Sequence, residues 1–210
     1  MKILLLGSTG LVGSHVLQQA LQHKKMTQVI APVRSLLNIT HPKLKTMVMD
    51  FDDLPQDKDF WAVDAVICAL GSTMQKAGSK QAFRKVDYGY PLEFAKMAKQ
   101  HGVKTYVLNS ALGANAHSLI FYNRVKGELE NALKDLNFDS LTLVRPGLIE
   151  GHRQEQRTAE QLFLKITHAV QFILPAALHN NPAENIATAL LNAAIEQPQG
   201  VHIISSKALV

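Results

Sequence analysis

The chain has 210 residues, of which 47% are hydrophobic and 19% are charged, a balance typical of globular proteins and not of disordered or collagen-like ones. This length predicts a single domain over residues 1–210. The net charge of +5 comes from basic residues that form no stripe or cluster, so we expect no nucleic-acid partner.

Cysteine and histidine content limits the other classes. Cys68 is the only cysteine, which excludes an intramolecular disulfide and a cysteine-based zinc site. None of the nine histidines pairs at metal-ligand spacing, so we expect no metal. A lone thiol is typical of a reducing compartment, and no stretch approaches the roughly 18 apolar residues of a membrane span. We therefore expect a cytoplasmic protein with no membrane partner.

Short apolar runs, typical of buried strands, alternate with longer amphipathic segments, typical of helices. In chain order the pattern predicts strand 3–6, helix 11–23, strands 28–33, 44–49 and 65–70, helix 91–100, strand 105–108, helix 121–136, strand 141–144, helices 159–173 and 183–196, and strand 201–204. This alternation predicts an α/β fold with a doubly wound parallel sheet, an NAD(P)-binding Rossmann fold. Residues 148–210 would add a small region on the substrate side.

A glycine-rich loop follows the first predicted strand and opens the first helix. Gly7 allows a tight turn, Gly10 lets backbone N–H groups approach a diphosphate, and Gly13 lets the helix pack close to the strand. The helix N-terminus supplies partial positive charge to the phosphates. The cofactor contacts predicted here are Gly7, Ser8, Thr9, Gly10, Leu11, Val12 and Gly13.

Arg34 ends the second predicted strand, where proteins that prefer NAD place an acidic residue for the ribose 2′-hydroxyl. An arginine would instead pair with a 2′-phosphate, and Ser35 would donate a second hydrogen bond. The sequence therefore predicts a preference for NADP(H). The alternative is a solvated loop arginine, which leaves NAD(H) open.

Tyr122 and Lys126 are four residues apart on one face of a predicted helix, and Ser110 ends the strand before it. A tyrosine with a pKa of about 10 is a poor base at neutral pH, and a nearby ammonium favours the phenolate. Ser110 would then hydrogen-bond the substrate oxygen. Taken singly, the three residues are also consistent with a capping serine, an amphipathic tyrosine and a surface lysine.

These features together resemble the short-chain dehydrogenase/reductase (SDR) superfamily, and within it the atypical, Tat-interacting-protein-like oxidoreductase branch. The resemblance covers nearly the whole chain and weakens after residue 155. The segments that carry it, beside the glycine loop, are Cys68-Ala-Leu-Gly-Ser-Thr73, Val86-Asp87-Tyr88, Asn109-Ser110-Ala-Leu-Gly113, Tyr122-Asn-Arg-Val-Lys-Gly-Glu128 and Arg145-Pro-Gly147.

The resemblance implies a role for each matching position. Ser110, Tyr122 and Lys126 would form the catalytic triad, with Tyr122 and Lys126 also at the nicotinamide ribose. Asp87 departs from the family, because many members carry an asparagine in that region. The remaining cofactor contacts implied are Asp50 at the adenine, Leu70, Gly71 and Ser72 after the fourth strand, and Pro146, Gly147 and Leu148 near the nicotinamide amide.

The first functional hypothesis is an NADP(H)-dependent oxidoreductase that acts on a small carbonyl or alcohol. The second is an NADP(H)-binding regulatory or redox-sensing protein without turnover, and the third is a nucleotide-sugar epimerase. The expected partner is a small-molecule substrate, and a homodimer or a regulatory protein partner stays open. Arg153 or Arg157, in the polar stretch after the sixth strand, would meet an anionic substrate group.

Overall fold

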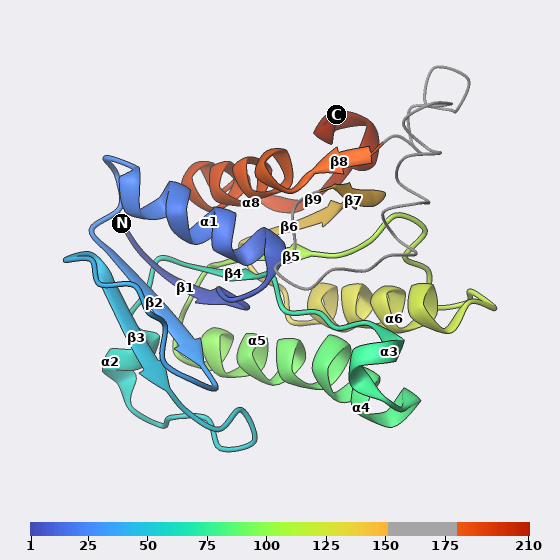
Figure 1. Cartoon of the computed structure of the whole chain (residues 1–210), viewed down its shortest axis with the longest axis horizontal. Helices are drawn as coiled ribbons and strands as arrows, with labels where there is room; N and C mark the ends of the chain where they lie inside the picture. The colour runs from blue at the N-terminus through green and yellow to red at the C-terminus, as the bar shows by residue number, and fades with distance from the viewer. Residues whose placement is uncertain (151–179) are drawn as a thin grey trace.

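Seven parallel strands form the central sheet of the computed structural model, which describes residues 1–150 and 180–210 (Figure 1). The strand order is β3-β2-β1-β4-β5-β6-β9, and every neighbouring pair is parallel. The strands are β1 (Lys2–Leu6), β2 (Gln28–Val33), β3 (Leu44–Val48), β4 (Ala65–Cys68), β5 (Thr105–Asn109), β6 (Ser140–Arg145) and β9 (Gly200–Ser205). This confirms the predicted doubly wound α/β fold.

Helices cover both faces of the sheet (Figure 1). On one face lie α1 (Leu11–Gln22) and α8 (Ala183–Glu196), and on the other lie α5 (Tyr90–Gln100) and α6 (Phe121–Asp135). Short helical segments lie between the strands: α2 (Lys58–Trp61), α3 (Met74–Ala77), α4 (Lys80–Arg84), and a π-helical turn, η1 (Lys85–Gly89), that leads directly into α5.

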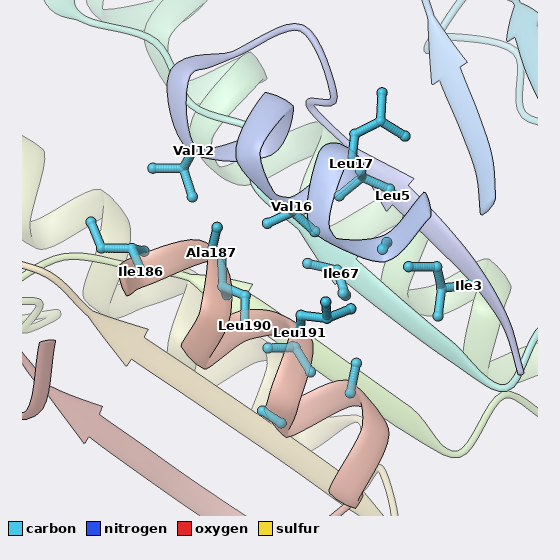
Figure 2. Packing of buried hydrophobic residues seen from close by; sticks show 14 of the residues in the cluster. Ile3, Leu5, Val12, Val16, Leu17, Ile67, Ile186, Ala187, Leu190 and Leu191 are labelled. Atoms are coloured by element: carbon cyan, nitrogen blue, oxygen red, sulfur yellow. The ribbon is translucent and has the colours of Figure 1, made fainter. Parts of the chain in front are cut away.

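The two-residue period of β1 divides the core into two clusters. Ile3 and Leu5 face α1 and α8, where Val16 and Leu190 are fully buried (Figure 2). Leu4 and Leu6 face the other way, toward α5 and α6. Burial on both faces explains why the strand is apolar at every position after Lys2, since each side chain loses contact with water whichever way it points.

The chain after β6 supplies α8 and β9 to the central fold and also forms smaller elements. A small parallel pair, β7 (Leu148–Glu150) with β8 (Asn180–Pro182), follows β6, and η3 (Ser206–Leu209) follows β9. The helix expected at residues 159–173 and the anion contacts expected at Arg153 and Arg157 lie outside the described residues. No helix in the described part of the chain is long and apolar enough to cross a membrane.

Candidate functional site

The strand order reverses between β1 and β4, because β2 and β3 lie on one side of β1 and the later strands on the other. In open parallel sheets, ligands bind beyond the carboxyl ends of the strands at such a switch point. The loops after β1 and β4 meet there. β4 ends at Cys68, two residues before the expected end at residue 70, and the amide of Ala69 still donates to the carbonyl of Leu6.

Two glycines of the first loop are required by backbone packing. Gly7 has φ +80°, and a Cβ there would lie 2.6 Å from the Ala69 carbonyl oxygen. A Cβ at Gly13 would lie 2.0 Å from the carbonyl oxygen of Gly7. Gly10 is less crowded, since its Cβ would meet only that same oxygen, at 3.3 Å. The loop therefore packs tightly against β4 and α1, and its tip at Gly10 has room for another molecule.

The start of α1 has the features of an anion site. Gly10 is its N-cap, no side-chain hydrogen bond caps it, and the first turn holds no acidic residue. Ser8 is buried, and its hydroxyl has no hydrogen-bond partner among the described residues. Free N–H groups and the helix dipole favour a phosphate at such a position. The residues present therefore fit the diphosphate of a dinucleotide.

The adenosine-side candidates lie at the ends of β2 and β3, which pair in register from Val29 to Val33. Arg34 and Ser35 are exposed directly after β2, the strand that pairs with β1. Asp50 is also exposed, and its carboxylate accepts the amide N–H of Asp52 at 3.0 Å. The guanidinium of Arg34 is thus accessible at the edge where the cofactor's first ribose is expected.

Lys126 forms a buried ion pair with Asp87. Its Nζ lies 2.8 Å from Asp87 Oδ1, and the backbone N–H of Ser72 donates to Asp87 Oδ2 at 2.7 Å. Burial lowers the pKa of the Lys126 ammonium, but the negative charge of Asp87, followed by that of Tyr122, outweighs burial and leaves the pKa above that of an ordinary lysine. Lys126 therefore stays charged, and Asp87 neutralises it.

Gly71 lies directly beside this ion pair. It is exposed, and a Cβ at Gly71 would lie 3.4 Å from Asp87 Oδ1 and 3.9 Å from Lys126 Nζ. The predicted cofactor residues after β4 thus adjoin the predicted lysine of α6. The sequence marks Asp87 as a departure from the family pattern but carries no sign of its direct contact with Lys126.

Tyr122 lies in the first turn of α6, one turn before Lys126, and its side chain packs against Phe83 with the ring centroids 5.8 Å apart. It is 37% exposed. The spacing of four residues places Tyr122 and Lys126 on one helix face, as the sequence indicates. The phenol is therefore accessible to a substrate.

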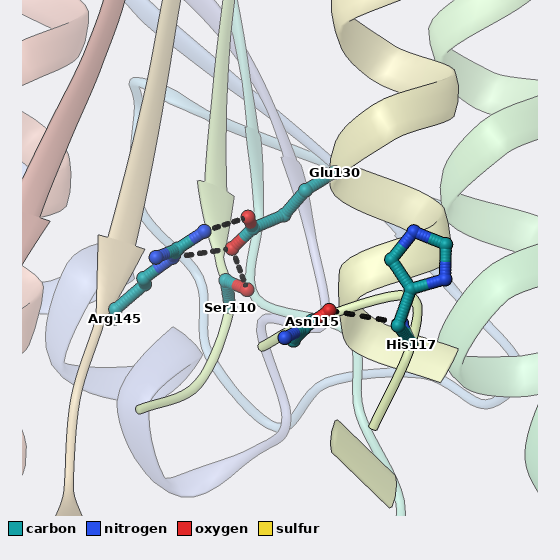
Figure 3. A network of polar contacts seen from close by, with 5 residues as sticks. All are labelled: Ser110, Asn115, His117, Glu130 and Arg145. Carbon is teal, nitrogen blue, oxygen red and sulfur yellow. Dashed lines mark hydrogen bonds and ion pairs between the residues drawn. The ribbon is translucent and has the colours of Figure 1, made fainter. Parts of the chain in front are cut away.

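Ser110 is bonded to a carboxylate and not to Tyr122 (Figure 3). Its hydroxyl donates to Glu130 Oε1 at 2.6 Å, and Arg145 Nε donates to the same oxygen at 2.9 Å. Arg145 also pairs with the second oxygen of Glu130. The single proton of the Ser110 hydroxyl is thus used, and only its lone pairs remain for a ligand.

Glu130 was not predicted, although the sequence holds a signal for it. It follows Lys126 by four residues and Tyr122 by eight, which places all three on one face of α6. Its side chain is almost completely buried, and an acidic residue on a buried helix face needs a partner. Arg145, at the end of β6, is that partner.

The segment after β6 is held by a buried asparagine. The amide of Gly147 donates to Asn181 Oδ1 at 2.7 Å, and the amide of Leu112 donates to the carbonyl of Pro146 at 2.7 Å. Leu148 is 36% exposed.

Among residues 1–150 and 180–210, no three histidine, cysteine or acidic side chains gather in a way that could hold a metal ion.

Comparisons with known proteins found relatives over most of the chain. Residues 7–188 match a family model described as "NAD(P)H-binding". The "Protein fmp52, mitochondrial" of Aspergillus fumigatus is 33% identical over 210 residues, covering 94% of this chain and 88% of the relative.

Solved structures show the same fold. A UDP-glucuronic acid 4-epimerase from Bacillus cereus in complex with NAD has a TM-score of 0.72 at 15% identity, covering 98% of this chain and 77% of that one. The oxidoreductase ylbE from Lactococcus lactis has a TM-score of 0.67 at 21% identity, covering 100% and 95%.

The expectation of a cytoplasmic protein is wrong. The relatives from Aspergillus fumigatus, Lodderomyces elongisporus and Debaryomyces hansenii are all named as mitochondrial proteins. The expectation rested on the single cysteine, and a reducing environment is not specific to one compartment.

The family match, the relatives and the Rossmann-type sheet agree, and the chain belongs to the NAD(P)H-binding family.

Proposed function

We propose that the chain is an oxidoreductase that uses NADP(H) to interconvert a small carbonyl compound and its alcohol. The observation that carries this proposal is the continuity of the site. Gly7 of the diphosphate loop contacts Ala69, and two residues later Gly71 borders the Lys126–Asp87 pair. A dinucleotide held at the glycine loop would thus extend toward the face of α6 that carries Tyr122 and Lys126.

Each residue has a separate task in this mechanism. The amides at the start of α1 and the hydroxyl of Ser8 bind the diphosphate, and Arg34 binds the 2′-phosphate. When bound, the nicotinamide supplies or accepts the hydride at its C4 atom. Tyr122 donates its hydroxyl proton to the carbonyl oxygen in reduction and takes a proton from the alcohol in oxidation. Lys126 lies on the same face of α6 and orients the groups bound beside Tyr122.

Ser110 takes a different part in this scheme from the one its position in the sequence indicates. Because its proton is bonded to Glu130, its oxygen accepts a hydrogen bond. A substrate hydroxyl is a suitable donor to that oxygen. Ser110 therefore helps to hold the alcohol form, while the carbonyl oxygen is bound through Tyr122.

We further infer that the chain belongs to the atypical SDR type, in the Tat-interacting-protein-like branch, because Tyr122 and Lys126 share an α6 face beside the glycine loop. The exposed Arg34 supports NADP(H) over NAD(H). The names of the relatives support a mitochondrial location.

A regulatory protein that binds NADP(H) without turnover is the second candidate. The observation that favours it is the use of Ser110 by Glu130 and of Lys126 by Asp87, since both groups already have a partner. The nucleotide-sugar epimerase is the third, and it has support from fold likeness alone.

Thermal unfolding with NADPH, NADP⁺, NADH and NAD⁺ tests cofactor binding. A ligand at a hundredfold excess over its Kd stabilises the native state by about 2.7 kcal/mol, which raises the Tm of a chain of this size by roughly 5–10 °C. Stabilisation by the two phosphorylated forms at lower concentration supports the proposal, and no stabilisation by any of the four refutes it.

A panel of small aldehydes, ketones and alcohols then separates the two leading candidates. Turnover that falls at least about a hundredfold in Tyr122→Phe, with unchanged NADPH affinity, supports the oxidoreductase. Cofactor binding without any turnover favours the regulatory protein. Full turnover by Tyr122→Phe refutes the role of the phenol.

A further inference from the structure

The β4–β5–β6 half of the site holds two ion pairs in which each carboxylate is buried. Asp87 is paired with Lys126, and Glu130 with Arg145. The side chains of Asp87 and Glu130 are each 1% exposed. The positive and negative charges in the two pairs therefore cancel. The ammonium of Lys126 in particular is not a free positive charge.

This half of the sheet is where the second nucleotide of a dinucleotide binds. The strands from β4 onward form the second mononucleotide-binding half, and the 2′-position of the first ribose is read after β2. Gly71 borders both Asp87 Oδ1 and Lys126 Nζ on this edge. The inference rests on the proposed function, because it takes the second nucleotide to be nicotinamide.

The nicotinamide ring carries one positive charge when oxidised and none when reduced. A charge in this half of the site therefore changes the affinity for the oxidised form and leaves the affinity for the reduced form nearly unaltered. Two unit charges about 10 Å apart, at the effective dielectric constant of about 20 found in proteins, change a binding constant by roughly tenfold. An unpaired Lys126 would thus disfavour the oxidised cofactor.

We propose that Asp87 determines the balance between oxidised and reduced cofactor by neutralising Lys126. The carboxylate is held for this task at both oxygens, by Lys126 Nζ and by the backbone N–H of Ser72. With the charge cancelled, the wild-type protein binds the two redox forms with Kd values within about threefold of each other. Asp87 is a specificity-determining residue in this sense, and it does not react.

A purely structural ion pair would behave differently. Loss of its stabilising effect would weaken or leave unchanged the binding of both redox forms alike. The ratio of the two Kd values is therefore the diagnostic quantity, because a general loss of order cancels in it.

Isothermal titration of NADP⁺ and NADPH into four proteins tests the proposal without any substrate. They are wild type, Asp87→Asn, Lys126→Met and the double variant. Asp139→Asn is the matched control, because Asp139 has the same side chain in an exposed ion pair with Lys99 directly before β6, at the amino-terminal ends of the strands. If NAD(H) binds more tightly, its two forms replace NADP(H).

The proton state of the isolated charge has to be controlled. In Asp87→Asn the groups that still face Lys126 are Tyr122 and Cys68, and burial lowers the pKa of the lone ammonium. Asp87→Asn is therefore titrated at about pH 6, where the ammonium is more fully charged, and Lys126→Met at about pH 8, with wild type measured at both.

The ratio of the Kd for NADP⁺ to the Kd for NADPH is expected to rise about tenfold in Asp87→Asn and to fall about tenfold in Lys126→Met. The double variant and Asp139→Asn are expected within about twofold of wild type. If the single variants bind both forms with the wild-type ratio, the proposal is overturned.

Wild type alone keeps the test decisive if the single variants do not fold. A preference of about tenfold or more for the reduced form would overturn the proposal, because it would indicate a net positive charge beside the ring. Failure of wild type to bind either form overturns the proposed function itself, and is distinct from an unaltered ratio.

Discussion

Substitution of Gly13 and of Gly10 by alanine separates the structural from the ligand-binding glycines of the loop. A Cβ at position 13 would lie 2.0 Å from the Gly7 carbonyl oxygen, a distance at which the backbone must move. The helix it would displace, α1, contributes Val16 and Leu17 to the core beside α8. At position 10 the only neighbour within 4 Å is 3.3 Å away, and φ is −78°.

The magnitudes follow from these distances. Alanine inside a helix gains about 1 kcal/mol over glycine, but overpacking of a core costs about 1–3 kcal/mol and more where backbone is struck. Gly13→Ala is therefore expected to lose about 2 kcal/mol of stability, which lowers the Tm by roughly 4–8 °C. Gly10→Ala is expected to unfold within about 2 °C of wild type and to bind cofactor at least about tenfold more weakly, because its methyl group fills the phosphate position.

The assay is thermal unfolding of both variants without ligand, followed by titration with NADPH. Gly13→Ala tests the packing of α1 against the loop, and Gly10→Ala tests the binding of the cofactor. The reasoning is refuted if Gly10→Ala lowers the Tm as much as Gly13→Ala does, or if it binds NADPH as tightly as wild type.

Three further outcomes can be checked. Glu130→Ala leaves Arg145 and Ser110 without their shared acceptor and should lower the stability by about 2–4 kcal/mol in denaturant unfolding, whereas Glu130→Gln, which keeps an acceptor oxygen, should lose less; equal losses would contradict the hydrogen-bond assignment. Arg34→Asp should reverse the preference of NADPH over NADH in competitive titration, since a carboxylate repels the 2′-phosphate, and an unchanged ratio would remove Arg34 from the site. Burial raises the pKa of the Cys68 thiol, so a water-soluble thiol reagent should label it only as fast as the protein unfolds; rapid labelling of the native protein would show that β4 opens.

The strands and the glycine loop could be predicted because their signals are local. β1 is apolar at every position after Lys2, since both faces are covered, and the turn that follows needs glycine for its φ of +80° at Gly7. The shared helix face of Tyr122 and Lys126 follows from a spacing of four residues. Each of these is a property of one short stretch of chain.

The contacts between the site residues were not predicted, because the residues that meet come from distant stretches of the chain. Asp87 reaches Lys126 from the π-helical turn before α5, and Glu130 reaches Ser110 from the third turn of α6. The π-helical turn itself has no signal in the apolar pattern. Hydrophobic periodicity indicates which face of a helix is buried, and it does not indicate which charged side chain is satisfied there.

The Glu130 carboxylate has a consequence for how the site can change shape. Ser110 follows β5, Arg145 ends β6, and Glu130 belongs to α6, so one side chain joins three separate elements at the same edge. A helix fastened in this way cannot slide along the sheet without breaking a buried charged contact. The end of β5, the end of β6 and the helix that carries Tyr122 are therefore expected to move together as one rigid unit.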